Sequence, residues 1–238
     1  MTHKAFFVAC FFALFLGSLI FTSCDKSDSY AVLSERAHQK FLEIKALSEQ
    51  NSCADMDKLS IKKVPYSCGH YFAIHENQIS TFEKLTKEYL ALQAEADNAK
   101  DRPIIYYYSP CVPYPPLEII CENGKAKLLY PYEIQDIEKL STAIEKSWES
   151  LKHFYDAVPC TNASDWRTQA ILTGCCYEAL AVHKTIRTDE FIEKTYLHTN
   201  LVGMKRMLEK TECSTVYCNN SFKEVKCVDG RPIVERQE

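Results

Sequence analysis

Cysteine is the residue that most constrains the fold of this chain, because each disulfide ties together two segments that are distant in sequence. The 238 residues contain 12 cysteines, a content that is typical of exported proteins and rare in cytosolic ones. Two of them, Cys10 and Cys24, lie in or directly after an apolar N-terminal run. The other ten are an even number, which in an oxidising compartment predicts up to five disulfides, formed among Cys53, Cys68, Cys111, Cys121, Cys160, Cys175, Cys176, Cys213, Cys218 and Cys227.

Spacing alone does not determine which cysteines pair. Short loops favour Cys53 with Cys68 and Cys111 with Cys121. Cys175 and Cys176 are neighbours in a segment that we expect to be helical, about 100° apart around its axis, so they should bond two different partners. Zinc sites favour close pairs such as CxxC, and the nearest approach is Cys213-x₄-Cys218. We therefore predict disulfides, with no metal ligands and no cofactor.

The N-terminus carries an export signal. Lys4 precedes an apolar run over residues 5–21, and the sequence Thr22-Ser-Cys-Asp25 follows it. One basic residue, an apolar stretch and small residues before a cut site are typical of a secretory signal peptide. The run is at the short limit for a transmembrane helix, which usually needs about 20 apolar residues, and acidic residues follow it at once.

The segment Leu19-Ile-Phe-Thr-Ser-Cys24 resembles the lipobox of bacterial lipoproteins, whose signal peptide is removed before a cysteine that becomes diacylated. Phe21 stands where that family usually has Leu, Val or Ile. The resemblance implies a signal peptide over residues 1–23, a lipid-anchored tether over 24–29 and a body over 30–238. Two acyl chains anchor a protein stably, which implies residence on the inner or outer bacterial membrane, with the body facing the periplasm or the outside.

A second processing route stays open. Cleavage after Cys24, with Thr22 as the small residue, would give a secreted protein without lipid. The triplets Asn162-Ala-Ser164 and Asn219-Asn-Ser221 match the glycosylation sequon, which suits a secreted eukaryotic, disulfide-rich protein.

Charge and glycine content exclude several functions. The formal net charge is −4 with no basic tail or stripe, so nucleic acid is not expected as a partner. The chain has only 6 glycines, and it contains neither a GxGxxG nor a Walker motif for phosphate binding. The oligomeric state does not follow from the sequence.

Hydrophobic periodicity predicts a mainly helical body. Five segments carry helical spacing: residues 30–49, 77–98, 133–156, 164–184 and 188–210. The fourth is nearly apolar all round, so we expect it to be the central, most buried helix. The fold class expected is α+β and predominantly helical: about five amphipathic helices in a disulfide-stabilised bundle with a small antiparallel β-hairpin element. One domain over residues 30–238 is the preferred division, and two subdomains split by residues 101–132 are the alternative.

Two short segments predict β-hairpins. Residues 117–130 contain Asn123-Gly124, and residues 224–234 contain Asp229-Gly230, the dipeptides that favour two-residue turns. Both follow the pattern Glu, two residues, Cys, one residue, Asn or Asp, Gly and a basic residue. The hairpins could share one sheet. Hairpin chemistry occurring twice explains this pattern, and an internal duplication is the alternative.

A tyrosine- and proline-rich segment is the preferred candidate for a partner-binding surface. Residues 104–116 contain four prolines, which exclude a helix and favour an extended path. Tyrosine is a large amphipathic side chain enriched at recognition surfaces, and the candidates are Tyr106, Tyr107, Tyr108 and Tyr114. Alternatively, these tyrosines simply cover the helices.

No catalytic residue is predicted. His70 and His75 would point to opposite faces of an extended segment, so with Glu76 they do not form a ligand set. Glu178 and His183 would lie about 140° apart on a helix, with His183 close to the negative end of its dipole. The sequence favours a non-enzymatic binding module of the inhibitor, immunity or scaffold type with a protein partner in the envelope. An envelope hydrolase with an unrecognised active site, such as a pair of carboxylates, is the alternative.

Overall fold

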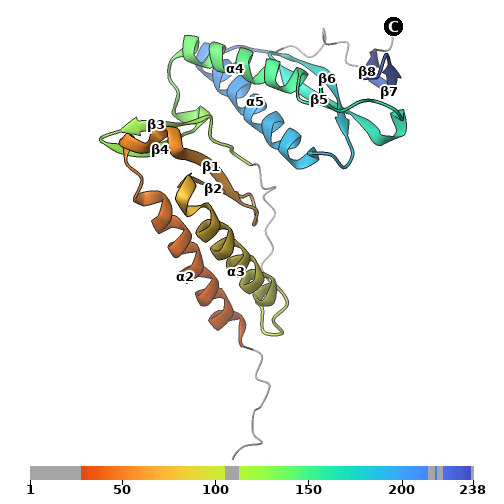
Figure 1. The fold of residues 1–238 in the computed structure, drawn as a ribbon. Coiled ribbons are helices and arrows are strands. Elements are labelled where there is room, and N and C mark those ends of the chain that lie inside the picture. The colour runs from red at the N-terminus through yellow and green to blue at the C-terminus, as the bar shows by residue number, and fades with distance from the viewer. Residues whose placement is uncertain (1–27, 105–112, 214–217, 219–221, 237–238) are drawn as a thin grey trace, which may run out of the picture.

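The chain folds into two lobes that are joined by a short connection (Figure 1). The computed structural model describes residues 28–104, 113–213, 218 and 222–236. We call residues 30–130 the N-lobe and residues 137–236 the C-lobe. Within the described ranges, none of the helices has the length and apolarity that crossing a bilayer requires.

The N-lobe contains two helices and two antiparallel hairpins. In chain order its elements are α2 (Tyr30–Glu49), the 3₁₀ helix η1 (Cys53–Lys58), β1 (Leu59–Val64), β2 (His70–His75), η2 (Glu76–Gln78), α3 (Ile79–Asp97), β3 (Glu118–Glu122) and β4 (Lys125–Leu129). Strands β1 and β2 pair with each other, as do β3 and β4. The second hairpin lies against the first.

The C-lobe has the same kinds of element in the same order. After η3 (Pro131–Glu133) come α4 (Ile137–Lys152), η4 (Ala163–Asp165), β5 (Trp166–Thr173), β6 (Cys176–His183), α5 (Thr188–Glu209), β7 (Phe222–Val228) and β8 (Arg231–Arg236). Asp136 caps α4 by accepting hydrogen bonds from the backbone N–H groups of Glu138 and Lys139. Again the second hairpin lies against the first.

The two lobes share their disulfide and turn geometry. Cys53 bonds Cys121 across 68 residues, and Cys160 bonds Cys227 across 67 residues. In each lobe the first cysteine also donates its backbone N–H to the glycine carbonyl of the second hairpin's turn, at 3.3 Å in the N-lobe and 2.8 Å in the C-lobe. Both turn residues of β3–β4 and of β7–β8 have positive φ, as a type I′ turn requires.

The repeat extends to the cores. Four apolar positions are fully or almost fully buried in both lobes at a nearly constant spacing along the chain. They are Ile44 and Leu151, Val64 and Ile171, Ile74 and Val182, and Phe82 and Phe191. The lobes are thus two copies of one structural unit, and the shared hairpin pattern is one part of that repeat.

The helix expected over residues 164–184 is wrong, because the segment forms the hairpin β5–β6. A run that is apolar on every side has no periodicity to separate a helix from a strand. Gly174 takes φ 84° at the turn, and the adjacent cysteines bond Cys213 and Cys218. These bonds confirm that Cys175 and Cys176 have two different partners, although neither residue is helical.

Other expectations of the architecture are also corrected. The other four helices are present, but they form two pairs that pack on hairpins, so the fold is mixed α+β and not a five-helix bundle. The hairpins β3–β4 and β7–β8 belong to different lobes and do not share a sheet. The pairings Cys53–Cys68 and Cys111–Cys121 are wrong, because Cys53 bonds Cys121. Cys68 is disulfide-bonded, and Cys111 lies outside the described residues.

An apolar cluster joins the lobes. Leu129 of the N-lobe packs with Leu140 and Ala143 of α4 and with Leu201 of α5. In Figure 1 the hairpins of the N-lobe lie on the side that faces the C-lobe, whereas β7–β8 lies at the outer end of the molecule.

Sequence differences between the two copies explain why β3–β4 docks on the helices of the other lobe, whereas β7–β8 packs only within its own lobe among the described residues. The N-lobe hairpin presents Ile120 and Leu129 to the cluster. The corresponding C-lobe residues are Lys226 and Glu235, which form an ion pair at 2.7 Å. A polar outer face is typical of the terminal unit in a repeat protein.

Candidate functional site

Comparison of equivalent positions in the two lobes separates residues that maintain the fold from residues that could bind a ligand or a partner. Positions that are alike in both lobes are explained by the fold that they share. Other positions carry different residues in the two lobes. Where such a side chain is exposed or lines a hollow, it is a better candidate for binding or catalysis. Two hollows are lined by residues of both lobes.

Tyr114 is the one predicted partner-binding residue that the structure describes, since Tyr106, Tyr107 and Tyr108 lie outside the described residues. Its side chain is 52% exposed, and its ring lies edge-on to Tyr132 with 6.4 Å between centroids. Tyr132 is 51% exposed and stacks on Tyr130 at 5.3 Å. We call Tyr114, Tyr130 and Tyr132 the tyrosine cluster.

The tyrosine cluster stands beside a hollow between the lobes. This hollow, of about 660 Å³, lies between the β1–β2 hairpin and the first half of α5. Pro113, Pro115 and Pro116 line it, and Asn200 of α5 donates its side-chain amide to the Pro113 carbonyl at 3.3 Å. Because the last two prolines are buried, the segment that carries Tyr114 is held in place.

Tyr71, Lys63 and Glu193 link the lobes across this hollow. The ammonium of Lys63 lies 3.1 Å from the Glu193 carboxylate and 5.6 Å from the centre of the Tyr71 ring. Burial raises the pKa of the Tyr71 phenol well above its usual range, and the negative charge of Glu193 raises it further. Tyr71 therefore stays neutral at physiological pH, and its buried hydroxyl has no hydrogen-bond partner within the described residues.

A second hollow adjoins the first. It measures about 560 Å³, lies between α4, α5 and the start of β3, and shares Lys194 and Leu197 with its neighbour. Three lysines line it together with one carboxylate, Glu118, which lies 3.2 Å from the Lys139 ammonium. We call this hollow the lysine pocket.

Ser147 and His198 are the nearest approach to a catalytic pair. The Ser147 Oγ lies 2.7 Å from the His198 Nδ1 and also 2.9 Å from the Ile144 carbonyl oxygen. The single hydroxyl proton can be donated to only one of these acceptors. Burial lowers the pKa of His198, which the nearby Leu172 carbonyl partly opposes.

The repeat assigns His198 to the scaffold. His198 packs against Trp148 at 5.4 Å, and at the corresponding places in the N-lobe Tyr89 packs against Phe41 at 5.7 Å. A ring from the second helix thus contacts a ring from the first helix in both cores. We interpret the bond to Ser147 as the satisfaction of one nitrogen, Nδ1, of a buried ring, whose Nε2 has no hydrogen-bond partner among the described residues.

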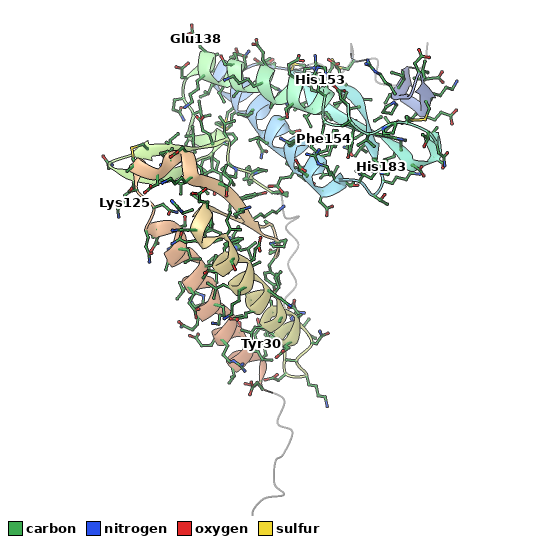
Figure 2. The ribbon with its side chains drawn as sticks, viewed as in Figure 1. Tyr30, Lys125, Glu138, His153, Phe154 and His183 are labelled. Atoms are coloured by element: carbon green, nitrogen blue, oxygen red, sulfur yellow. A yellow bond between two sulfur atoms is a disulfide. The ribbon has the colours of Figure 1, made fainter. Side chains whose placement is uncertain are left out.

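The other histidines singled out in the sequence also have structural roles. His70 packs against Phe41. His75 ends β2, and its Nδ1 accepts the Asn77 N–H at 3.3 Å. His183 ends β6, where Figure 2 labels it, and its Nδ1 accepts the N–H groups of Thr185 and Ile186. Its expected place near a helix C-terminus is wrong, since His183 and Glu178 both lie on β6.

Metal ligands do not gather in the described part of the chain, where no group of three His, Cys, Asp or Glu side chains could hold an ion. Glu76 belongs to η2 and forms no such group. No protein family, curated protein or solved structure matches this chain. The site therefore has to be judged on its own geometry.

Sequence reasoning missed most of this site. Tyr130 is the last residue of the N-lobe, Tyr132 lies in the connection between the lobes, and the lysines of the pocket come from α4 and α5. Lys139 and Lys146 are seven residues apart and Ser147 and Ser150 are three apart, spacings that share a helix face. This spacing could be read from the sequence, but helix faces that carry lysine and serine are common on open surfaces and do not by themselves indicate a pocket.

Proposed function

We propose that the chain is a non-enzymatic binding module of the bacterial cell envelope, held on the membrane by lipid attached to Cys24. Its body faces the periplasm or the outside of the cell. It recognises a protein partner through the tyrosine cluster at the edge of the interlobe cleft. The main support for this proposal is that the rings of Tyr114 and Tyr132 are half-exposed and pack against each other.

The tyrosine cluster has the properties of a recognition surface. Tyrosine is enriched among the residues that dominate binding energy at interfaces. The rings of the cluster are held against each other, and the neighbouring prolines are buried. A surface that is ordered before binding loses less conformational entropy when its partner arrives.

The disulfides support the proposed location. Four bonds join described residues, and such bonds persist in the periplasm and at cell surfaces but not in a reducing cytosol. Helix α2 begins at Tyr30, a few residues after Cys24, with Ser29 as its N-cap. An acyl anchor on Cys24 would therefore hold the body close to the bilayer.

Affinity capture from intact envelopes tests the proposed surface. The change is Tyr114→Ala with Tyr132→Ala, and the matched control is Tyr177→Ala, an exposed tyrosine of β6 away from the cleft. We expect the double variant to lose a specific partner that the wild type and the control retain. Both changes are at exposed positions, so the melting temperature should stay within about 2 °C of the wild type.

If the double variant folds normally and retains every partner, the tyrosine cluster is not the binding surface. The anchor is tested separately by mass spectrometry of the mature N-terminus. A diacylglyceryl-modified Cys24 is expected, and an unmodified cut after Cys24 would instead favour a secreted, non-lipidated protein.

A further inference from the structure

We infer that the lysine pocket binds an amphipathic organic anion, a carboxylate or phosphate head on an apolar body. This ligand differs in kind from the protein partner proposed for the tyrosine cluster. The pocket joins α4 and α5 of the C-lobe to the start of β3 in the N-lobe, and small-molecule sites often lie between two such units.

Two ammonium groups in the pocket form no ion pair within the described part of the chain. Glu118 is engaged with Lys139 at 3.2 Å. Lys194 contacts the Ser150 hydroxyl at 3.4 Å and forms no ion pair with a described residue. Lys146 forms neither an ion pair nor a side-chain hydrogen bond within the described ranges. A ligand with negative charge would supply the missing partner for both.

Hydroxyl groups and apolar side chains complete the pocket. Thr142 and Ser150 lie beside the lysines on α4, and their hydroxyl groups can donate hydrogen bonds to ligand oxygens. Leu117 and Leu197, which pack on the apolar cluster between the lobes, supply apolar surface. The volume of about 560 Å³ lies within the range of pockets that hold small organic ligands.

The corresponding face of the N-lobe shows that the fold does not require this arrangement. Gln39 stands in place of Lys146, and Leu85 stands in place of Lys194. Lys40, in place of Ser147, lies 3.1 Å from the carboxylates of both Glu43 and Glu88. Lys40 of the N-lobe is thus neutralised by two ion pairs, whereas Lys146 and Lys194 of the C-lobe form no ion pair with a described residue, although Lys194 lowers the pKa of the nearby Glu190.

Calorimetric titration of the purified protein at low salt tests the inference. The probes are hexanoate, decanoate, decyl phosphate, inorganic phosphate and decyltrimethylammonium, each below its micelle concentration. We expect decanoate or decyl phosphate to bind, with affinity rising up to about fourfold per added methylene. The cation should not bind, and inorganic phosphate should bind at least tenfold more weakly than decyl phosphate.

Matched variants assign the binding to the pocket. Lys146→Gln with Lys194→Gln should raise the dissociation constant at least tenfold. Lys84→Gln, at an exposed lysine of α3, should leave it unchanged. The inference is overturned if neither alkyl anion binds, if the alkyl cation binds equally well, or if the double variant is folded and binds as the wild type does. The ratio of decanoate to decyl phosphate affinity identifies the head group.

Discussion

Removing either of the two equivalent disulfides should destabilise the protein by a similar amount. The changes are Cys53→Ala with Cys121→Ala in the N-lobe, and Cys160→Ala with Cys227→Ala in the C-lobe. The bonds close loops of 68 and 67 residues, for which the chain-entropy relation gives about 4 kcal/mol each at 25 °C. Cys160 is also buried in its core, so the C-lobe pair should cost about 1 kcal/mol more.

Guanidinium denaturation measures both costs and separates the lobes. The chain has 2 tryptophans, Trp148 and Trp166, and both lie in the C-lobe. Tryptophan fluorescence therefore reports on the C-lobe, whereas far-ultraviolet circular dichroism reports on both lobes. The structural equivalence is refuted if one bond costs less than about 1 kcal/mol while the other costs its full value, or if the N-lobe bond costs more than the C-lobe bond.

Three further predictions concern single groups. The pKa of Tyr71 is raised by burial, so the unfolded chain ionises first and stability should fall above about pH 10; Tyr71→Phe should flatten that loss in urea denaturation at pH 9 to 11. The pKa of His198 is lowered by burial, so the unfolded chain binds the proton first and stability should fall below about pH 6.5. His198→Tyr, the residue type of Tyr89 in the other lobe, should reduce the loss of stability between pH 7 and pH 5. Peptide mapping without reduction should find Cys68 bonded to Cys111, since these cysteines match Cys176 and Cys218 in the repeat; a bond from Cys68 to any other cysteine would contradict the repeat.

The helices could be predicted where one face alone is buried. In α4 the buried residues Leu140, Ala143 and Leu151 recur at helical spacing, and the expected range overlaps the observed one. The β5–β6 hairpin could not be recognised, because its apolar run gives the same pattern for a strand and a helix. Its identity depends on contacts from outside the segment, namely the disulfides to Cys213 and Cys218.

The repeat was only partly visible in the sequence. The Cys-x-Asn/Asp-Gly pattern of the two second hairpins could be recognised, because turn chemistry restricts residue identity. The core positions could not, since Ile44 and Leu151 or Val64 and Ile171 match only in burial and not in residue type. Burial depends on the whole fold and cannot be read from either segment alone.

The sequence predicted one residue of the candidate site, Tyr114, but not the residues from other elements that lie beside it. Tyr114 was identified from composition, because large amphipathic rings beside prolines are typical of recognition surfaces. Its neighbour Tyr132 comes from the connection between the lobes. The lysine pocket likewise combines residues of α4, α5 and the start of β3. These residues come together only when the two lobes dock, so their sequence positions do not reveal the pocket.

Site-specific photocrosslinking in intact cells tests the central claim most directly, namely that the tyrosine cluster at the interlobe cleft is the surface that meets a partner. A photoreactive phenylalanine analogue replaces Tyr132 in one strain and Tyr177 in another. The account predicts one discrete, reproducible adduct from position 132 and none from position 177. Equal adducts from both positions, or an adduct from position 177 alone, would contradict it.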